Sequence, residues 1–83
     1  MNLQANVLSV LDEALALDGR TSGFDGNTPL LGALPELDSM AIVTVISALE
    51  SRFGIMFDDD EISGETFATV DSLTNLIASK LDA

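Results

Sequence analysis

Two serines of this chain follow an aspartate and precede an apolar residue, in the runs Asp38-Ser39-Met40 and Asp71-Ser72-Leu73. An aspartate just before a helix is a good N-cap, because its carboxylate accepts backbone N–H groups of the first turn. With Asp38 as the cap, Ser39 becomes the first helical residue, beside unpaired N–H groups and the positive end of the helix dipole. A phosphodiester on such a serine is electrostatically favoured. Because the tripeptide is short, its surroundings must decide whether either serine is a site.

Side chains that usually perform catalysis are missing from the sequence. It contains no Cys and no His. The lack of Cys excludes disulfides, thiolate metal sites and thiol nucleophiles, and the lack of His removes the commonest general base and metal ligand. A serine nucleophile needs an activating base, and the pattern offers none beside Ser39. We therefore expect a protein that is not an enzyme.

The chain is short and strongly acidic. Its 83 residues make one small domain, spanning residues 1–83, and 3 basic against 14 acidic side chains give a net charge of −11. This charge disfavours nucleic acid and anionic membranes and favours partners with basic docking patches. No signal peptide and no apolar run long enough to span a bilayer is visible. We expect a cytoplasmic monomer without membrane insertion.

Helical periodicity predicts three main helices, at about residues 2–17, 39–53 and 72–81. Gly19 and Gly54 are candidate stop signals for the first two helices. Asp71 is a candidate N-cap for the third. The core stripe expected on the second helix consists of Met40, Val43, Ile46, Leu49 and Phe53.

Two loops connect the expected helices. The first, residues 19–37, is long and rich in Gly and Pro, and long loops in compact domains are often functional. Its leucines at positions 30, 31, 34 and 37 are expected to fix it to the bundle. The second loop contains four consecutive acids at residues 58–61, which could begin a short helix. The fold prediction is an all-α, small helical bundle of three main helices plus one short helix.

The acidic run at residues 58–61 invites comparison with a calcium loop. An EF-hand counted from Asp59 requires a bidentate Glu at its twelfth position, which is Val70 here. We therefore predict no EF-hand and no dedicated metal site. A solvated acidic face is the preferred interpretation, and weak divalent binding by the clustered carboxylates stays open.

Residues 38–55 carry a longer pattern, in which Asp-Ser-Met opens an apolar helix that ends in Leu49, Glu50, two further residues and Phe53. With the preceding long loop and the following acidic loop, the chain resembles the acyl carrier protein family over nearly its whole length. The resemblance implies that Ser39, flanked by Asp38 and Met40, carries 4'-phosphopantetheine. The thiol of that arm holds acyl groups as thioesters, which explains how a chain without Cys takes part in thiol chemistry.

Ser72 lies in a literal Asp-Ser-Leu, which is closer to the family consensus than the run around Ser39. Its position speaks against it, because it opens the last helix, where the family has no modified serine. Ser39 follows the long loop and precedes the Glu50 and Phe53 pattern. The resemblance therefore assigns the arm to Ser39.

The resemblance also implies partners: a phosphopantetheinyl transferase, an acyl-loading ligase or synthase, and acyl-transferring enzymes. Housekeeping carriers expose an acidic face on the second helix, whereas this chain has Ala41 and Thr44 there, bordered by Glu36 and Glu50. These four residues are the predicted docking positions. Residues 34–40 and 58–67 resemble carriers encoded with bacterial exosortase systems. We therefore expect a specialised carrier.

Two other functions remain open: a peptidyl or aminoacyl carrier, and an unmodified acidic helical module that only docks a partner. Met40 is interpreted as a conservative core replacement for Leu, with adaptation of an acyl pocket as the alternative. The residues predicted to form the wall of such a pocket are Ile46, Ala48, Leu49, Phe57, Ile62 and Phe67.

Overall fold

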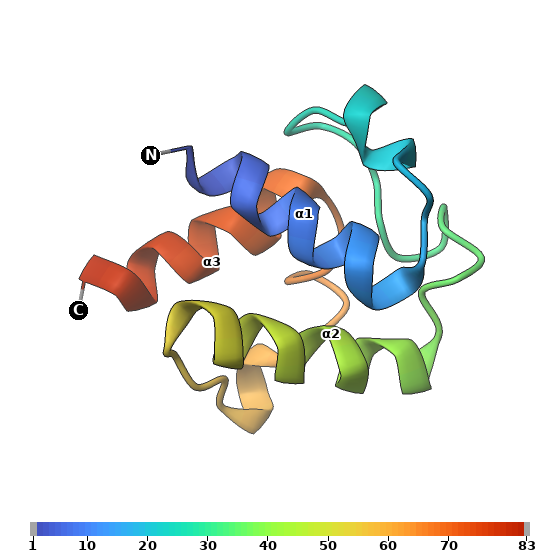
Figure 1. The fold of residues 1–83 in the computed structure, drawn as a ribbon. Helices are drawn as coiled ribbons and strands as arrows, with labels where there is room; N and C mark the ends of the chain where they lie inside the picture. The colour runs from blue at the N-terminus through green and yellow to red at the C-terminus, as the bar shows by residue number, and fades with distance from the viewer. Residues whose placement is uncertain (1, 83) are drawn as a thin grey trace.

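A computed structural model describes residues 2–82 (Figure 1). Three α-helices, α1 (Leu3–Leu15), α2 (Ser39–Phe53) and α3 (Val70–Asp82), are joined by loops that contain the short 3-10 helices η1 (Arg20–Gly23) and η2 (Asp59–Glu61). The predicted all-α bundle is confirmed, and η2 is the short helix expected over the acidic run. The helix η1, inside the long loop, was not predicted. Within the described part of the chain, no helix is both long and apolar enough to cross a bilayer.

The bundle is organised around α1, which packs against both α2 and α3 (Figure 1). Apolar side chains from all three helices form one buried cluster. The long loop contributes Leu30 and Leu37 to this cluster, and Leu34 packs against it. Leu31 is exposed, so its predicted anchoring role is wrong. The second half of the loop, from Leu30 to Leu37, is thus fixed to the core before the chain enters α2.

The helix α1 is shorter than predicted. Asn2 caps its start by accepting from the Ala5 N–H at 3.1 Å. The helix ends at Leu15 because Ala16 adopts a left-handed conformation, with φ 53°. Gly19 is therefore not the residue that stops the helix. Its N–H instead donates to the Asp12 carboxylate at 3.0 Å, which folds the chain back onto α1.

The buried side of α2 differs from the predicted stripe. Ile46 and Leu49 are buried as expected, but Met40 is 80% exposed, Val43 is 64% exposed, and Val45 is completely buried. The physical reason is that α2 carries apolar residues on nearly all sides, so periodicity alone does not select the side that meets the bundle. Contacts with α1 and the loops make that selection.

The helix α3 begins at Val70, two residues earlier than predicted. The Thr69 hydroxyl accepts from the Ser72 N–H at 3.1 Å, and the Ser72 hydroxyl accepts from the Thr69 N–H at 3.0 Å. This reciprocal pair closes the helix start in the manner of a capping box. Asp71 lies within the first turn, so its prediction as the N-cap is wrong.

Candidate functional site

Ser39 is the first residue of α2, where the long loop ends (Figure 1). As predicted, Asp38 is the N-cap, and its Oδ1 accepts from the Ala41 N–H at 2.8 Å. The Ile42 N–H donates to the Asp38 carbonyl at 2.9 Å. By helix geometry the N–H groups of Ser39 and Met40 have no acceptor within the helix. They remain available to an anion at this position.

The Ser39 side chain itself is exposed and makes no hydrogen bond to residues 2–82. The helix dipole places partial positive charge at this end of α2. A phosphate attached to the hydroxyl therefore fits the site sterically and electrostatically. The residues that would hold the group are Ser39, through its oxygen, and the first turn of α2, through its free N–H groups.

Ser72 lies in a different environment. Its hydroxyl is within 2.9 Å of the Thr66 carbonyl and 2.9 Å of the Thr69 carbonyl, in position to donate to either. It also accepts from the Thr69 N–H, and the residue is half-buried. Attaching a bulky group to this oxygen would break the cap of α3. The geometry therefore favours Ser39 over Ser72.

Met40, which flanks Ser39, projects from the surface with 80% of its area exposed. Its interpretation as a core replacement for Leu is therefore wrong. Among the predicted docking residues on α2, Thr44 is exposed and Ala41 is half-buried against the core. Met40 and Thr44 thus lie on the solvent side of the helix, next to the candidate attachment point.

The two acidic docking candidates are both engaged within the chain. The Glu36 carboxylate pairs with the Arg20 guanidinium of η1, and this hydrogen bond lowers the pKa of Glu36 below its usual value of 4.5. The Glu50 carboxylate accepts from the Phe57 N–H at 2.9 Å. Sequence reasoning missed the Arg20 contact, because nothing in the spacing of residues 20 and 36 signals it.

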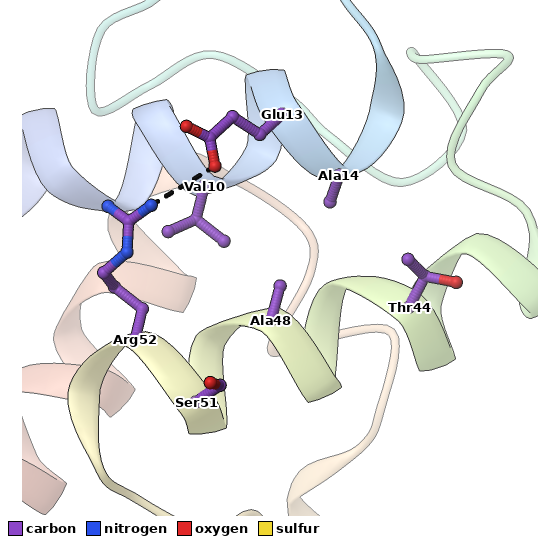
Figure 2. Close-up of a pocket in the computed structure, with 7 residues that line it drawn as sticks. All are labelled: Val10, Glu13, Ala14, Thr44, Ala48, Ser51 and Arg52. Atoms are coloured by element: carbon purple, nitrogen blue, oxygen red, sulfur yellow. Dashed lines mark hydrogen bonds and ion pairs between the residues drawn. The ribbon is translucent and has the colours of Figure 1, made fainter.

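A groove between α1 and α2 was also missed (Figure 2). Its volume is about 500 Å³. Small side chains, Ala14 and Ala48, leave the space open, and an ion pair between Arg52 and Glu13 at 3.2 Å spans it. Of the predicted pocket-wall residues, only Ala48 lines this groove. The others belong to the core, apart from Ile62, which is exposed: Ile46, Leu49, Phe57 and Phe67.

The acidic run is held in place by α3. The Lys80 ammonium lies 2.6 Å from the Glu61 carboxylate and 5.7 Å from the centre of the Phe57 ring. The hydrogen bond from Lys80 is the main reason that the pKa of Glu61 lies below its usual value. Asp58 and Glu61 also form a capping box around η2. Within residues 2–82, no group of three or more acidic side chains is arranged to hold a metal ion.

Comparison with known proteins connects this geometry to a family. The family model described as the phosphopantetheine attachment site matches residues 5–77. The solution NMR structure of a holo acyl carrier protein from Nitrosomonas europaea is 43% identical, covers 100% of both chains and superposes with a TM-score of 0.93. A comparison with curated proteins finds no significant match.

These findings confirm the resemblance at the level of the family and of the cofactor, 4'-phosphopantetheine. They also support the expectation of a carrier without catalytic activity of its own. The chain belongs to the phosphopantetheine-attachment family of carrier proteins and is a homologue of acyl carrier proteins.

Proposed function

We propose that Ser39 is the attachment point of the 4'-phosphopantetheine arm and that the loaded protein delivers acyl groups to partner enzymes. The observation that carries this proposal is the environment of Ser39: an exposed hydroxyl at the capped start of α2, beside free N–H groups. Ser72, the competing serine, has its hydroxyl committed to the cap of α3.

In the attachment reaction this chain supplies only the serine oxygen and the N–H groups of the first turn of α2. When the arm is installed from coenzyme A, the Ser39 oxygen bonds to the pantetheine phosphorus, the diphosphate P–O bond breaks, and adenosine 3',5'-bisphosphate leaves. The hydroxyl proton must pass to a general base, and the chain has no His for this role. The first turn of α2 stabilises the phosphodiester. Once bound, the arm supplies a thiol that holds the acyl group as a thioester.

The finer assignment is a specialised carrier, similar to those encoded with bacterial exosortase systems. Its support is the solvent side of α2, where a housekeeping carrier has acids and this chain has Thr44 and Ser51, with the half-buried Ala41 at its border. Such a carrier serves a dedicated acyl-loading ligase or synthase and dedicated acyl-transferring enzymes in the cytoplasm. A housekeeping ketoacyl synthase that elongates this holo-protein as fast as its own carrier would contradict the assignment.

Intact-mass analysis tests the proposal. The apo-protein is incubated with a phosphopantetheinyl transferase and coenzyme A. We expect complete addition of one arm to the wild type and to Ser72→Ala, and none to Ser39→Ala, with circular dichroism confirming that each variant is folded. Addition to Ser39→Ala would refute the site. Loading of the holo-protein with fatty-acyl and aminoacyl donors then separates an acyl carrier from a peptidyl carrier.

A further inference from the structure

The long loop that precedes α2 is closed by an ion pair between its two halves. The Arg20 guanidinium, in η1, pairs with the Glu36 carboxylate near the end of the loop. Glu36 lies two residues before the cap Asp38 and three residues before Ser39. The pair therefore connects η1 to the short segment that leads directly into the candidate attachment point.

Arg20 is itself held in a defined place by α1. The Asp12 carboxylate of α1 accepts from the Gly19 N–H at 3.0 Å and from the Thr21 hydroxyl at 2.9 Å. Thr21 is only 9% exposed. The Leu17 carbonyl accepts from the backbone N–H of Arg20 at 3.1 Å and from its Nε at 3.2 Å. The backbone and the guanidinium of Arg20 are thus both tied to the end of α1 and the turn that follows it.

Glu36 depends on Arg20 for the pairing of its charge. One carboxylate oxygen contacts the guanidinium, while the other is buried and has no hydrogen-bond partner in the described part of the chain. A buried carboxylate without a partner is strongly disfavoured, so Glu36 would turn towards water if Arg20 were removed. The next residue, Leu37, is 4% exposed, and its N–H donates to the Leu34 carbonyl at 3.0 Å. A shift of Glu36 therefore disturbs the turn that leads into the Asp38 cap.

From these contacts we infer that Arg20 is a positioning residue for the attachment of the phosphopantetheine arm. Through Glu36 it holds the segment before α2 in the place from which Asp38 caps the helix, so the free N–H groups of the first turn are ordered before the phosphate arrives. The inference rests on the proposed function of Ser39. If only a fraction of the molecules have this segment in place, the affinity for the transferase is lowered by that fraction. Loss of Arg20 should therefore raise KM, whereas kcat, which refers to the bound complex, should stay unchanged.

Hydrogen exchange of the isolated apo-protein, followed residue by residue by NMR, tests the positioning role without any enzyme. The amides to watch are those of Leu37, Ala41 and Ile42, which donate to the turn before the cap or to the cap residue itself. In Arg20→Gln we expect them to exchange about fivefold faster, because the unpaired carboxylate favours opening of this segment. The matched control is Arg52→Gln, which removes the same charge from an ion pair near the other end of α2 and should leave these amides unchanged.

Steady-state arm transfer from coenzyme A then measures the consequence for the reaction. For Arg20→Gln we expect the transferase KM to rise about threefold at unchanged kcat. Adding Glu36→Gln to this variant removes the unpaired charge and should return both KM and the exchange rates most of the way to those of the wild type. Arg20→Lys keeps a cation beside Glu36 and should lie closer to the wild type in both measurements. Circular dichroism confirms that each variant is folded.

The two measurements together separate positioning from other roles. A raised KM with unchanged exchange would mean that Arg20 contacts the transferase directly, and faster exchange with unchanged KM would mean that it serves stability alone. Either result overturns the inference. A double variant that behaves no better than Arg20→Gln alone would contradict the part assigned to Glu36. Failure of the wild type to accept an arm contradicts the proposed function of Ser39 instead, and the intact mass reports it independently of the exchange data.

Discussion

Two segments with the same pattern, Asp38-Ser39-Met40 and Asp71-Ser72-Leu73, lie at the start of a helix. Their positions relative to the first helical residue differ by two. Asp38 is the cap of α2, so Ser39 is its first residue and points to solvent. The cap position of α3 is Thr69, so Ser72 is the third residue and turns back onto the cap. The comparison shows that the place of a serine relative to the cap decides whether its hydroxyl is free.

The largest difference in stability is expected when the apolar residue of each segment, Met40 or Leu73, is replaced. Leu73 is completely buried, whereas Met40 is 80% exposed. Leu73→Ala should lower the free energy of unfolding by about 3 kcal/mol, because it removes core packing and leaves a cavity. Met40→Ala should change it by less than about 0.5 kcal/mol. Urea unfolding at equilibrium measures both values. Equal losses would contradict the burial of Leu73 and the exposure of Met40.

Replacement of the two serines should give a smaller difference in the free energy of unfolding. Ser72→Ala removes the hydroxyl that accepts from the Thr69 N–H and leaves a partly buried donor unpaired. We expect a loss of about 1–2 kcal/mol in the free energy of unfolding. Ser39→Ala removes no hydrogen bond within the described chain and should be neutral within about 0.5 kcal/mol. A destabilised Ser39→Ala would show that Ser39 has a structural role that the geometry lacks.

For the two aspartates the order of the stability losses should be reversed, because Asp38 is a helix cap and Asp71 is not. Asp38→Ala removes the cap bond to the Ala41 N–H and should cost about 1 kcal/mol. Asp71 lies in the first turn of α3, where its charge favours the helix dipole, so Asp71→Ala should cost only about 0.5 kcal/mol. Asp38→Asn, which retains a capping oxygen, is the matched control and should restore most of the stability. Thermal unfolding followed by circular dichroism ranks the three variants.

The smallest expected effect on stability comes from two ion pairs, one near each segment. Glu36 pairs with Arg20 before α2, and Glu61 pairs with Lys80 on α3. Both pairings lower the pKa of the carboxyl in the folded state. Their stabilisation is therefore complete above the unfolded pKa and is lost as pH falls through the lowered folded pKa.

Substitution by Gln removes this part of the pH dependence. Between about pH 5 and about pH 3, the wild type should lose stability relative to Glu61→Gln and Glu36→Gln. The difference should be larger for Glu61, because its pair is less exposed than that of Glu36 and is less screened by water. Urea midpoints at several pH values check this order. Parallel pH profiles for the wild type and Glu61→Gln would contradict it.

Much of α2 could be predicted because its signals are local. Its cap at Asp38, its start at Ser39 and its end before Gly54 all agree with the structure. The start of α3 was misplaced because two capping patterns overlap there, and the reciprocal Thr69 and Ser72 bonds prevail over Asp71. The sequence shows both patterns but not their relative strength.

The features that could not be predicted depend on contacts between distant segments. The exposure of Met40 and Val43 follows from the side of α2 that α1 covers, which a helix apolar on nearly all sides does not reveal. The pairing of Glu36 with Arg20 and of Glu13 with Arg52 likewise requires the fold. For the candidate site, the sequence thus indicated the proposed attachment residue, Ser39, and its cap, Asp38, while the exposure of the surrounding side chains became visible only in the structure.

The most direct test of Ser39 as the attachment point is mass spectrometry of the protein purified from its native cells, with peptide fragmentation to locate any modification. We predict a phosphopantetheine group on the peptide that contains Ser39, bonded through the serine oxygen, and an unmodified peptide around Ser72. A modification on Ser72, or a protein found only without the arm, would contradict it.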